Sequence, residues 1–128
     1  RNAEQVAAWL QSQPAIRQVY YPGIPSHPHH EVAATQMKAF GGMLAFEVRG
    51  GVAAGKKIMD SVNLCRLAVS LGDCETLIQH PSSMTHAAMA RDNRLAAGIS
   101  DGLVRVSIGC EDAEDLIADF DQAFEFVK

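Results

Sequence analysis

Two hydroxyls and one guanidinium could together bind a small polar ligand. Ser70 and Thr85 flank a bend in the segment Leu67–His86, and Arg105 lies in the middle of an apolar run. Hydroxyls and backbone groups on a bend can bind a polar ligand, and a planar guanidinium can bind a carboxylate through two N–H groups. The simpler explanations are an ordinary turn for the bend, and an internal ion pair or a solvated sheet face for Arg105. The residues by themselves leave these interpretations open.

A second group of chemically active side chains lies in the segment 27–31, which holds three histidines and one glutamate. Imidazole is a common metal ligand, but this spacing does not place the three rings on one helix face. We therefore predict a solvated loop that leads into a helix, with no metal site. Ser26 is expected to cap that helix and Pro28 to lie in its first turn.

The cysteines are Cys65, Cys74 and Cys110, an odd number without the close CxxC spacing of a zinc site. This pattern is typical of a reduced, cytoplasmic protein rather than of a disulfide framework. Cys65 and Cys74 are expected to pack as small hydrophobic residues, and the reactivity of all three thiols stays open. The acidic run 111–115 is expected to stabilise the first turn of a helix through the helix dipole.

Composition restricts the class of protein further. A net charge of -4 gives no electrostatic reason to expect nucleic acid or an anionic membrane as a partner. No apolar run approaches the length of a membrane span, and the first residues show no signal-peptide pattern. The chain opens at Arg1, directly in a helical segment, so we expect it to be part of a longer protein.

Apolar periodicity predicts alternating helices and strands. The predicted helices are 1–13, 31–38, 52–62, 87–97 (with Gly98 as its stop) and 112–127, and the predicted strands are 16–20, 43–48, 65–71, 76–79 and 103–108. In the third strand, Cys65, Leu67, Val69 and Leu71 are expected to share one face.

The predicted strands 65–71 and 76–79 are joined by too few residues for a parallel crossover, which needs about a dozen or more. We therefore predict an antiparallel pair. Residues 1–128 should form a single α+β domain, a small and largely antiparallel sheet with helices packed mainly on one face.

Several motifs together resemble a known family. Tyr20–Pro28 (YYPGIPSHP), Phe40–Leu44 (FGGML), Ser70–Gly72 (SLG), His80–His86 (HPSSMTH) and Gly102–Asp112 (GLVRVSIGCED) are similar, in order and spacing, to the C-terminal part of the Cys/Met-metabolism family of pyridoxal-phosphate (PLP) enzymes. The resemblance covers nearly the whole chain. It implies a fold type I enzyme, usually a homotetramer of tight dimers, in which an N-terminal domain holds the cofactor and this chain forms the smaller domain that closes over the substrate.

The resemblance also implies roles for individual residues. The family's carboxylate-binding arginine falls on Arg105, its serine on Ser70, and the threonine whose backbone lies near the bound amino acid falls on Thr85. Cystathionine-processing relatives commonly carry glutamate where this chain has Val69. With Leu71, this apolar residue favours an uncharged thioether such as L-methionine.

The segment Leu67–His86 is most similar to the methionine γ-lyase branch of the family. The implied reaction is α,γ-elimination of L-methionine to methanethiol, 2-oxobutanoate and ammonia. Cystathionine γ-lyase, cystathionine γ-synthase or O-acetylhomoserine sulfhydrylase activity remains an alternative, as does a non-catalytic module that binds an amino acid. The expected partners are a sulfur amino acid, the N-terminal domain of the same protein and further subunits.

The chain departs from the family in one respect. Lys38, Lys56, Lys57 and Lys128 do not lie in the family's Schiff-base motif, and the motif that binds the cofactor phosphate is absent. No catalytic residue is therefore predicted within this sequence. PLP should be bound mainly by the N-terminal domain, and the chain alone should be inactive.

Overall fold

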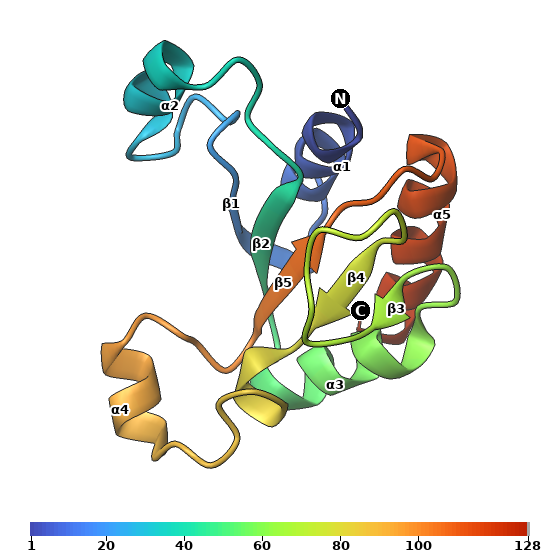
Figure 1. Cartoon of the computed structure of the whole chain (residues 1–128). Helices are drawn as coiled ribbons and strands as arrows, with labels where there is room; N and C mark the ends of the chain where they lie inside the picture. Colours follow the sequence, from blue (N-terminus) through green and yellow to red (C-terminus); the bar gives the residue numbers. More distant parts are fainter. Residues whose placement is uncertain (128) are drawn as a thin grey trace.

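A computed structural model describes residues 1–127 and contains one five-stranded sheet (Figure 1). The strands lie in the order β1 (Ile16–Tyr20), β2 (Met43–Val48), β5 (Leu103–Ser107), β4 (Leu77–Gln79) and β3 (Arg66–Leu67). Neighbouring strands are antiparallel except for β3 and β4, which are parallel. The predicted, largely antiparallel sheet is confirmed.

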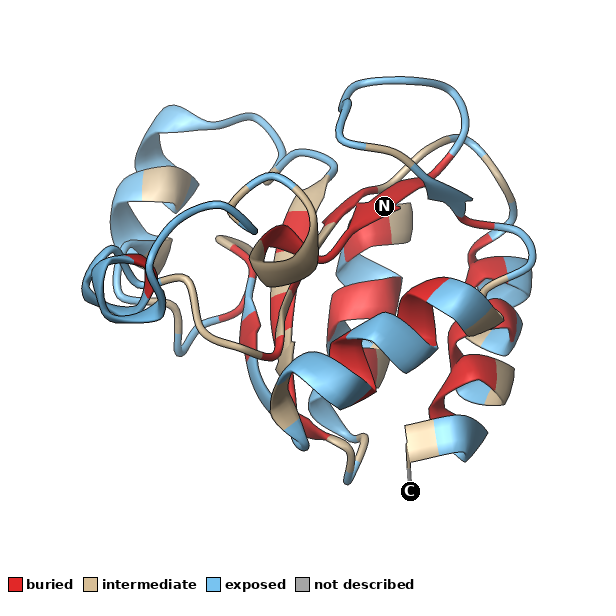
Figure 2. Cartoon of the chain, turned by 90° about the horizontal axis from the view of Figure 1, so that it is seen from below, coloured by how far each residue is buried: buried red, intermediate tan, exposed pale blue. Residues whose placement is uncertain are grey.

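Three helices cover one face of the sheet: α1 (Asn2–Gln11), α3 (Gly51–Ser61) and α5 (Ala113–Phe124). Their buried sides face the strands in Figure 2. Two short helices, α2 (His30–Gln36) and α4 (Arg91–Ala96), project at opposite ends of the molecule (Figure 1). Single 3-10 turns, η1 (Pro81–Ser83) and η2 (Glu125–Val127), complete the fold. The predicted α+β class is confirmed.

The hydrophobic core lies between the sheet and these three helices. Alternate residues of β2 and β5 point toward the helices. In return, every third or fourth residue of α5 points toward the sheet. Phe46 on β2 packs edge-on against Phe120 on α5, with ring centroids 6.0 Å apart. The most buried members of this core are Val6, Leu10, Phe46, Ile58, Ile78, Val104, Val106, Leu116 and Phe120.

Several helix boundaries differ from the prediction. The predicted Ser26 cap is wrong: α2 follows His29, whose side chain makes no capping hydrogen bond. Residues 24–30 instead form successive turns, in which His27 N donates to Ile24 O and His30 N donates to His27 O. Gly98 does end α4, with a φ of +80°, a conformation that glycine adopts without a steric penalty.

The segment 65–71 is the main correction. Only Arg66 and Leu67 form a strand there, and Leu67, Val69 and Leu71 are 52%, 57% and 57% exposed instead of sharing a buried face. Cys65 is buried as expected, but Cys74, which was also predicted to pack as a small hydrophobic residue, is exposed. The alternation failed as a signal because β3 is an edge strand of two residues, after which the chain turns away from the core.

The pairing of β3 with β4 is also not as predicted. Arg66 lies beside Leu77 and Leu67 beside Ile78 in a parallel register. A helical crossover is needed when two long strands are to be joined in parallel. Here the strands have two and three residues, so the loop 68–76 suffices to return the chain to the starting end of the pair.

Candidate functional site

The sheet face opposite α1, α3 and α5, here called the outer face, carries polar side chains at its centre. On β5, Val104 and Val106 point into the core, so Arg105 and Ser107 point to the outer face. Register places Gln79 of β4 beside Arg105, and Ala45 of β2 on its other side. A long cation is thus flanked by one polar residue and one small residue.

Arg105 contacts the loop 68–76 directly. Its Nη2 donates to the carbonyl oxygen of Val69 (3.1 Å) and to that of Ser70 (2.9 Å). Gly72 N in turn donates to Ser107 Oγ (2.9 Å), so Arg105 and Ser107 of β5 both hold the loop. Within residues 1–127, no carboxylate forms an ion pair with Arg105.

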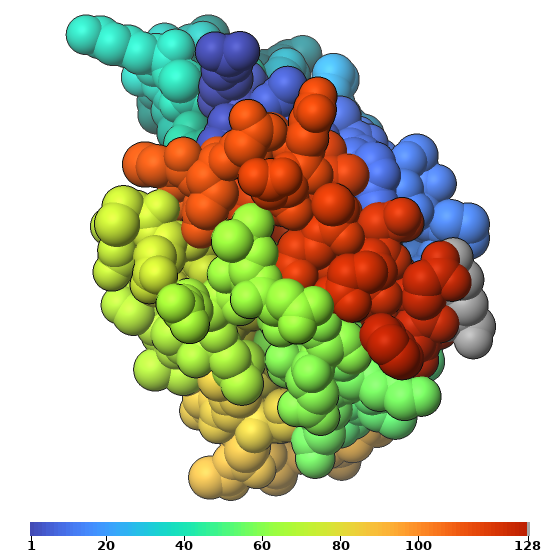
Figure 3. All heavy atoms as spheres, turned by 90° about the vertical axis from the view of Figure 1, so that its right-hand side faces the viewer, coloured from blue at the N-terminus to red at the C-terminus, as the bar shows by residue number. Residues whose placement is uncertain are grey.

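The two ends of the loop are fixed more firmly than its tip. Cys110 N donates to Cys74 O (2.8 Å), and the Glu111 carboxylate accepts the Thr76 hydroxyl (2.8 Å). Figure 3 shows the loop, in yellow-green, at the surface beside the orange segment that follows β5. The tip around Ser70 is exposed, so it can be reached by a ligand.

The structure brings some of the predicted site residues together and not others. Val69, Ser70 and Arg105 meet, but through backbone carbonyls; the Ser70 hydroxyl and the side chains of Val69 and Leu71 remain exposed. Thr85 lies after η1, with its hydroxyl 2.9 Å from Nδ1 of His86 and with no contact to Arg105. The assignment of all five to substrate binding stays a prediction.

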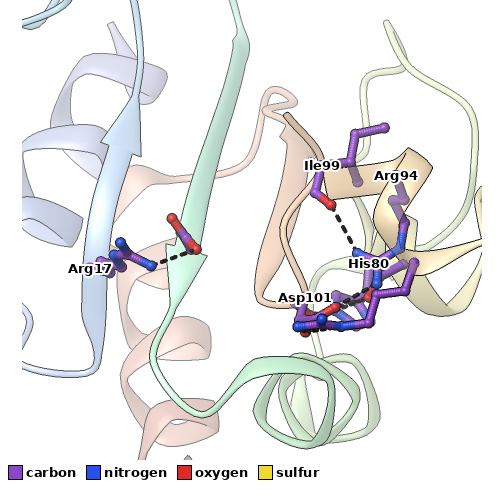
Figure 4. A network of polar contacts seen from close by, with 8 residues as sticks. Arg17, His80, Arg94, Ile99 and Asp101 are labelled. Carbon is purple, nitrogen blue, oxygen red and sulfur yellow. Dashed lines mark hydrogen bonds and ion pairs between the residues drawn. The ribbon is translucent and has the colours of Figure 1, made fainter. Parts of the chain in front are cut away.

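A polar network that the sequence analysis missed holds the segment after β4 (Figure 4). His80 is fully buried, with Nε2 2.8 Å from Asp101 O and Nδ1 2.7 Å from Ser83 Oγ. Burial lowers the pKa of His80. Arg91 and Arg94 both donate to the Asp101 carboxylate, and these hydrogen bonds lower its pKa to about 2. The network ties α4 and η1 to the turn before β5.

A second buried network fixes the chain before the loop. The Asp119 carboxylate of α5 accepts three consecutive backbone N–H groups, those of Asn63 (2.7 Å), Leu64 (3.0 Å) and Cys65 (2.9 Å). Burial, and then the nearby Asp119 charge, raise the pKa of the Cys65 thiol. Nothing in the sequence indicated this contact, because the three N–H groups lie 54 to 56 residues before Asp119.

Metal and cofactor chemistry have little support in these residues. Within the described part of the chain, no three histidine, cysteine, aspartate or glutamate side chains gather as a metal site would require. Lys38, Lys56 and Lys57 are exposed, the last two on the solvent-exposed side of helix α3. Lys128 lies outside the described residues. These residues do not fit a PLP site, so no step through the cofactor is derived from them.

No helix among residues 1–127 is both long enough and apolar enough to cross a lipid bilayer. Fold and outer face together define the class: a small α+β domain in which a guanidinium on the outer face of the sheet is held by the backbone carbonyls of a bend.

Comparison with known proteins gives the family. Residues 1–125 match the family described as Cys/Met metabolism PLP-dependent enzyme, and the chain belongs to this family. It is 55% identical over 125 residues to the L-methionine gamma-lyase of Fusobacterium nucleatum subsp. polymorphum, covering 98% of this chain and 32% of that protein. It is 57% identical over 119 residues to the L-methionine gamma-lyase of Porphyromonas gingivalis, covering 93% and 30% respectively.

Among solved structures, the cystathionine gamma synthase of Xanthomonas oryzae pv. oryzae in complex with aminoacrylate and cysteine superposes with a TM-score of 0.89. That protein is 50% identical, and the match covers 97% of this chain and 32% of the other. The chain therefore spans about a third of the length of the relatives it matches. Similar identities to a lyase and to a synthase define the family without separating its specificities.

Proposed function

We propose that this chain is the C-terminal, substrate-carboxylate-binding part of a PLP-dependent L-methionine γ-lyase. The whole protein would convert L-methionine and water to methanethiol, 2-oxobutanoate and ammonia by α,γ-elimination. The observation that carries the proposal is the pair of hydrogen bonds that Arg105 donates to the carbonyl oxygens of Val69 and Ser70. This contact joins the two segments in which the family resemblance had placed substrate binding.

The hydrogen bonds of Arg105 support a role as a carboxylate clamp. Nη2 anchors the guanidinium on the bend, while Nε and Nη1 have no partner among the described residues. A guanidinium fixed at one nitrogen and free at others can donate to a carboxylate with little further loss of freedom. Holding the α-carboxylate would orient the Cα–H bond of the amino acid for proton removal.

The remaining functions are proposed for protein outside this sequence. PLP and the Schiff-base lysine would belong to an N-terminal domain, against which residues 1–128 close, and subunits would assemble as a homotetramer. We also propose a cytoplasmic location, supported by three cysteines that are all free, two of them exposed.

Val69 favours methionine over cystathionine as the substrate. Its side chain is 57% exposed on the tip of the loop, and its own carbonyl oxygen is one of the two that accept a hydrogen bond from Arg105. An apolar surface there suits a thioether and offers nothing to the distal ammonium of cystathionine. The first alternative function is that of a cystathionine lyase or synthase, or an O-acetylhomoserine sulfhydrylase, of the same family. The second alternative is a non-catalytic module that binds an amino acid.

The test is an assay of the full-length protein, loaded with PLP, on L-methionine and L-cystathionine side by side. We expect a higher kcat/KM with methionine and release of methanethiol. Preference for cystathionine would replace the proposal by the first alternative, and binding of amino acids without turnover would favour the non-catalytic module.

A further inference from the structure

Gln79 occupies the position next to Arg105 on the outer face. The two residues are partners across the β4–β5 pair, while the preceding partners, Ile78 and Val106, belong to the core. Side chains therefore alternate, and those of Gln79 and Arg105 leave the sheet on the same side. Directly opposed residues of an antiparallel pair have Cβ atoms about 4.5–5.5 Å apart, so these two long side chains can touch.

The burial of Gln79 is unusual for a glutamine on the polar face of a sheet. Its exposed fraction is 3%, and its Oε1 is fully buried without a hydrogen-bond donor. Buried amide oxygens are paired in the great majority of proteins, and an exception calls for an explanation. The Oε1 atom of Gln79 is therefore a buried acceptor that receives no hydrogen bond in this structure.

Arg105, the register partner of Gln79, has donors that are not in use. Only Nη2 of the five-donor guanidinium is engaged, by Val69 and Ser70, and the other register neighbour of Arg105 is Ala45, which cannot compete for it. Because Gln79 is the register partner of Arg105 on β4, a rotation of the guanidinium can bring Nε or Nη1 within reach of Gln79 Oε1.

We propose that Gln79 is a positioning residue for Arg105. Its Oε1 accepts a hydrogen bond from an N–H of Arg105 when the guanidinium binds the substrate carboxylate. This hydrogen bond fixes the orientation of the guanidinium plane. This inference rests on the proposed function, because it requires that Arg105 binds a carboxylate. Gln79 itself touches neither substrate nor cofactor.

The experiment uses the full-length protein and two unreactive ligands, L-norleucine and pentylamine, which is norleucine without its carboxylate. The ratio of their inhibition constants reports the carboxylate contact alone. Gln79→Met, which keeps the length but removes the acceptor, should reduce the preference for norleucine about tenfold and leave pentylamine unchanged. Gln79→Glu should abolish the preference, because its carboxylate would pair with Arg105 permanently.

Thermal unfolding separates this role from a purely structural one. Gln79→Met removes an unpartnered buried amide, so its melting temperature should equal or exceed that of the wild type. Gln18→Met, an exposed glutamine on β1, is the matched control and should change neither measurement. If Gln79→Met keeps the full norleucine preference, or weakens both ligands alike while melting earlier, the positioning role is wrong. If the wild type itself shows no norleucine preference, the carboxylate clamp and this inference both fail.

Discussion

Nη2 of Arg105 lies 2.9 Å from the carbonyl oxygen of Ser70, although the two residues are 35 positions apart in the chain. The contact joins the central part of β5 to the exposed tip of the loop 68–76. It orients a cation without neutralising it, because a carbonyl carries no net charge. These contacts therefore leave the positive charge of the guanidinium uncompensated.

Replacing Arg105 by alanine in the full-length protein should lower kcat/KM for methionine by about 2–4 kcal/mol, or roughly 30- to 1000-fold, because a charge-assisted contact is lost. Arg105→Lys should recover only part of this loss, since an ammonium lacks the planar fork. Arg17→Ala is the control: this exposed strand arginine pairs with Glu47 at 3.4 Å, and its loss should be nearly silent. Near-normal kcat/KM in Arg105→Ala would show that the carboxylate binds elsewhere.

Substituting Val69 by glutamate should weaken the use of methionine, by about tenfold in kcat/KM, because a carboxylate replaces an apolar surface next to the thioether. The measurement is kcat/KM for methionine and cystathionine in the same preparation. Leu67→Glu introduces the same charge at a similarly exposed position, 52% against 57%, and should leave both values unchanged. Improved methionine turnover in Val69→Glu would contradict the assignment of this residue to the substrate pocket.

Asp119 should contribute strongly to stability. Its carboxylate satisfies the N–H groups of residues 63–65, so Asp119→Ala leaves buried donors unpaired and should cost about 3 kcal/mol in the free energy of unfolding. Asp119→Asn keeps one acceptor oxygen and should cost about half as much. Urea unfolding measures both, with the exposed Asp121→Ala as control. An unchanged midpoint in Asp119→Ala would mean that water replaces the carboxylate without loss.

Acid should weaken the α4 network through Asp101. The pKa of this carboxyl is lowered to about 2 by hydrogen bonds from Arg91 and Arg94, whereas an unfolded aspartate titrates near 3.9. The unfolded state thus takes up its proton first, so the stabilisation is complete above about pH 4 and is lost as the pH falls toward 2. The stability difference between wild type and Asp101→Asn should shrink over this range. A difference that stays constant from pH 5 to pH 2 would exclude Asp101 as the titrating group.

Protonation of His80 should also lower the free energy of unfolding, but at a higher pH than protonation of Asp101. Burial lowers its pKa, so protonation favours the unfolded state, and its stabilising contribution is complete above about pH 6.5 and declines below it. His80→Gln should flatten the pH dependence of unfolding between pH 5 and 7. His86→Gln, a partly exposed histidine on the following segment, is the control. An unaltered pH dependence in His80→Gln would contradict the assignment.

The sequence by itself determined the elements with a clear period. The bounds of β1 and β2 were predicted correctly. In β2 the alternation of apolar and polar residues reflects the two faces of a half-buried strand, whereas β1 is buried only at Ile16 and Val19 and has a register shift between Ile16 and Gln18. The predicted helix 112–127 likewise contains α5, one of the three helices that cover the sheet, and the apolar run around Arg105 forms β5.

Only the tertiary structure decided how the segment 63–76 folds. Apolar alternation in 65–71 predicted one continuous strand. Instead, the N–H groups of residues 63–65 donate to Asp119, on a helix more than fifty residues away, and the chain leaves the sheet after Leu67. Such long-range contacts have no local period, so no pattern in the sequence indicates them. The same holds for Gln79 and for the seating of Arg105 on the loop, which arise from strand register and not from sequence spacing.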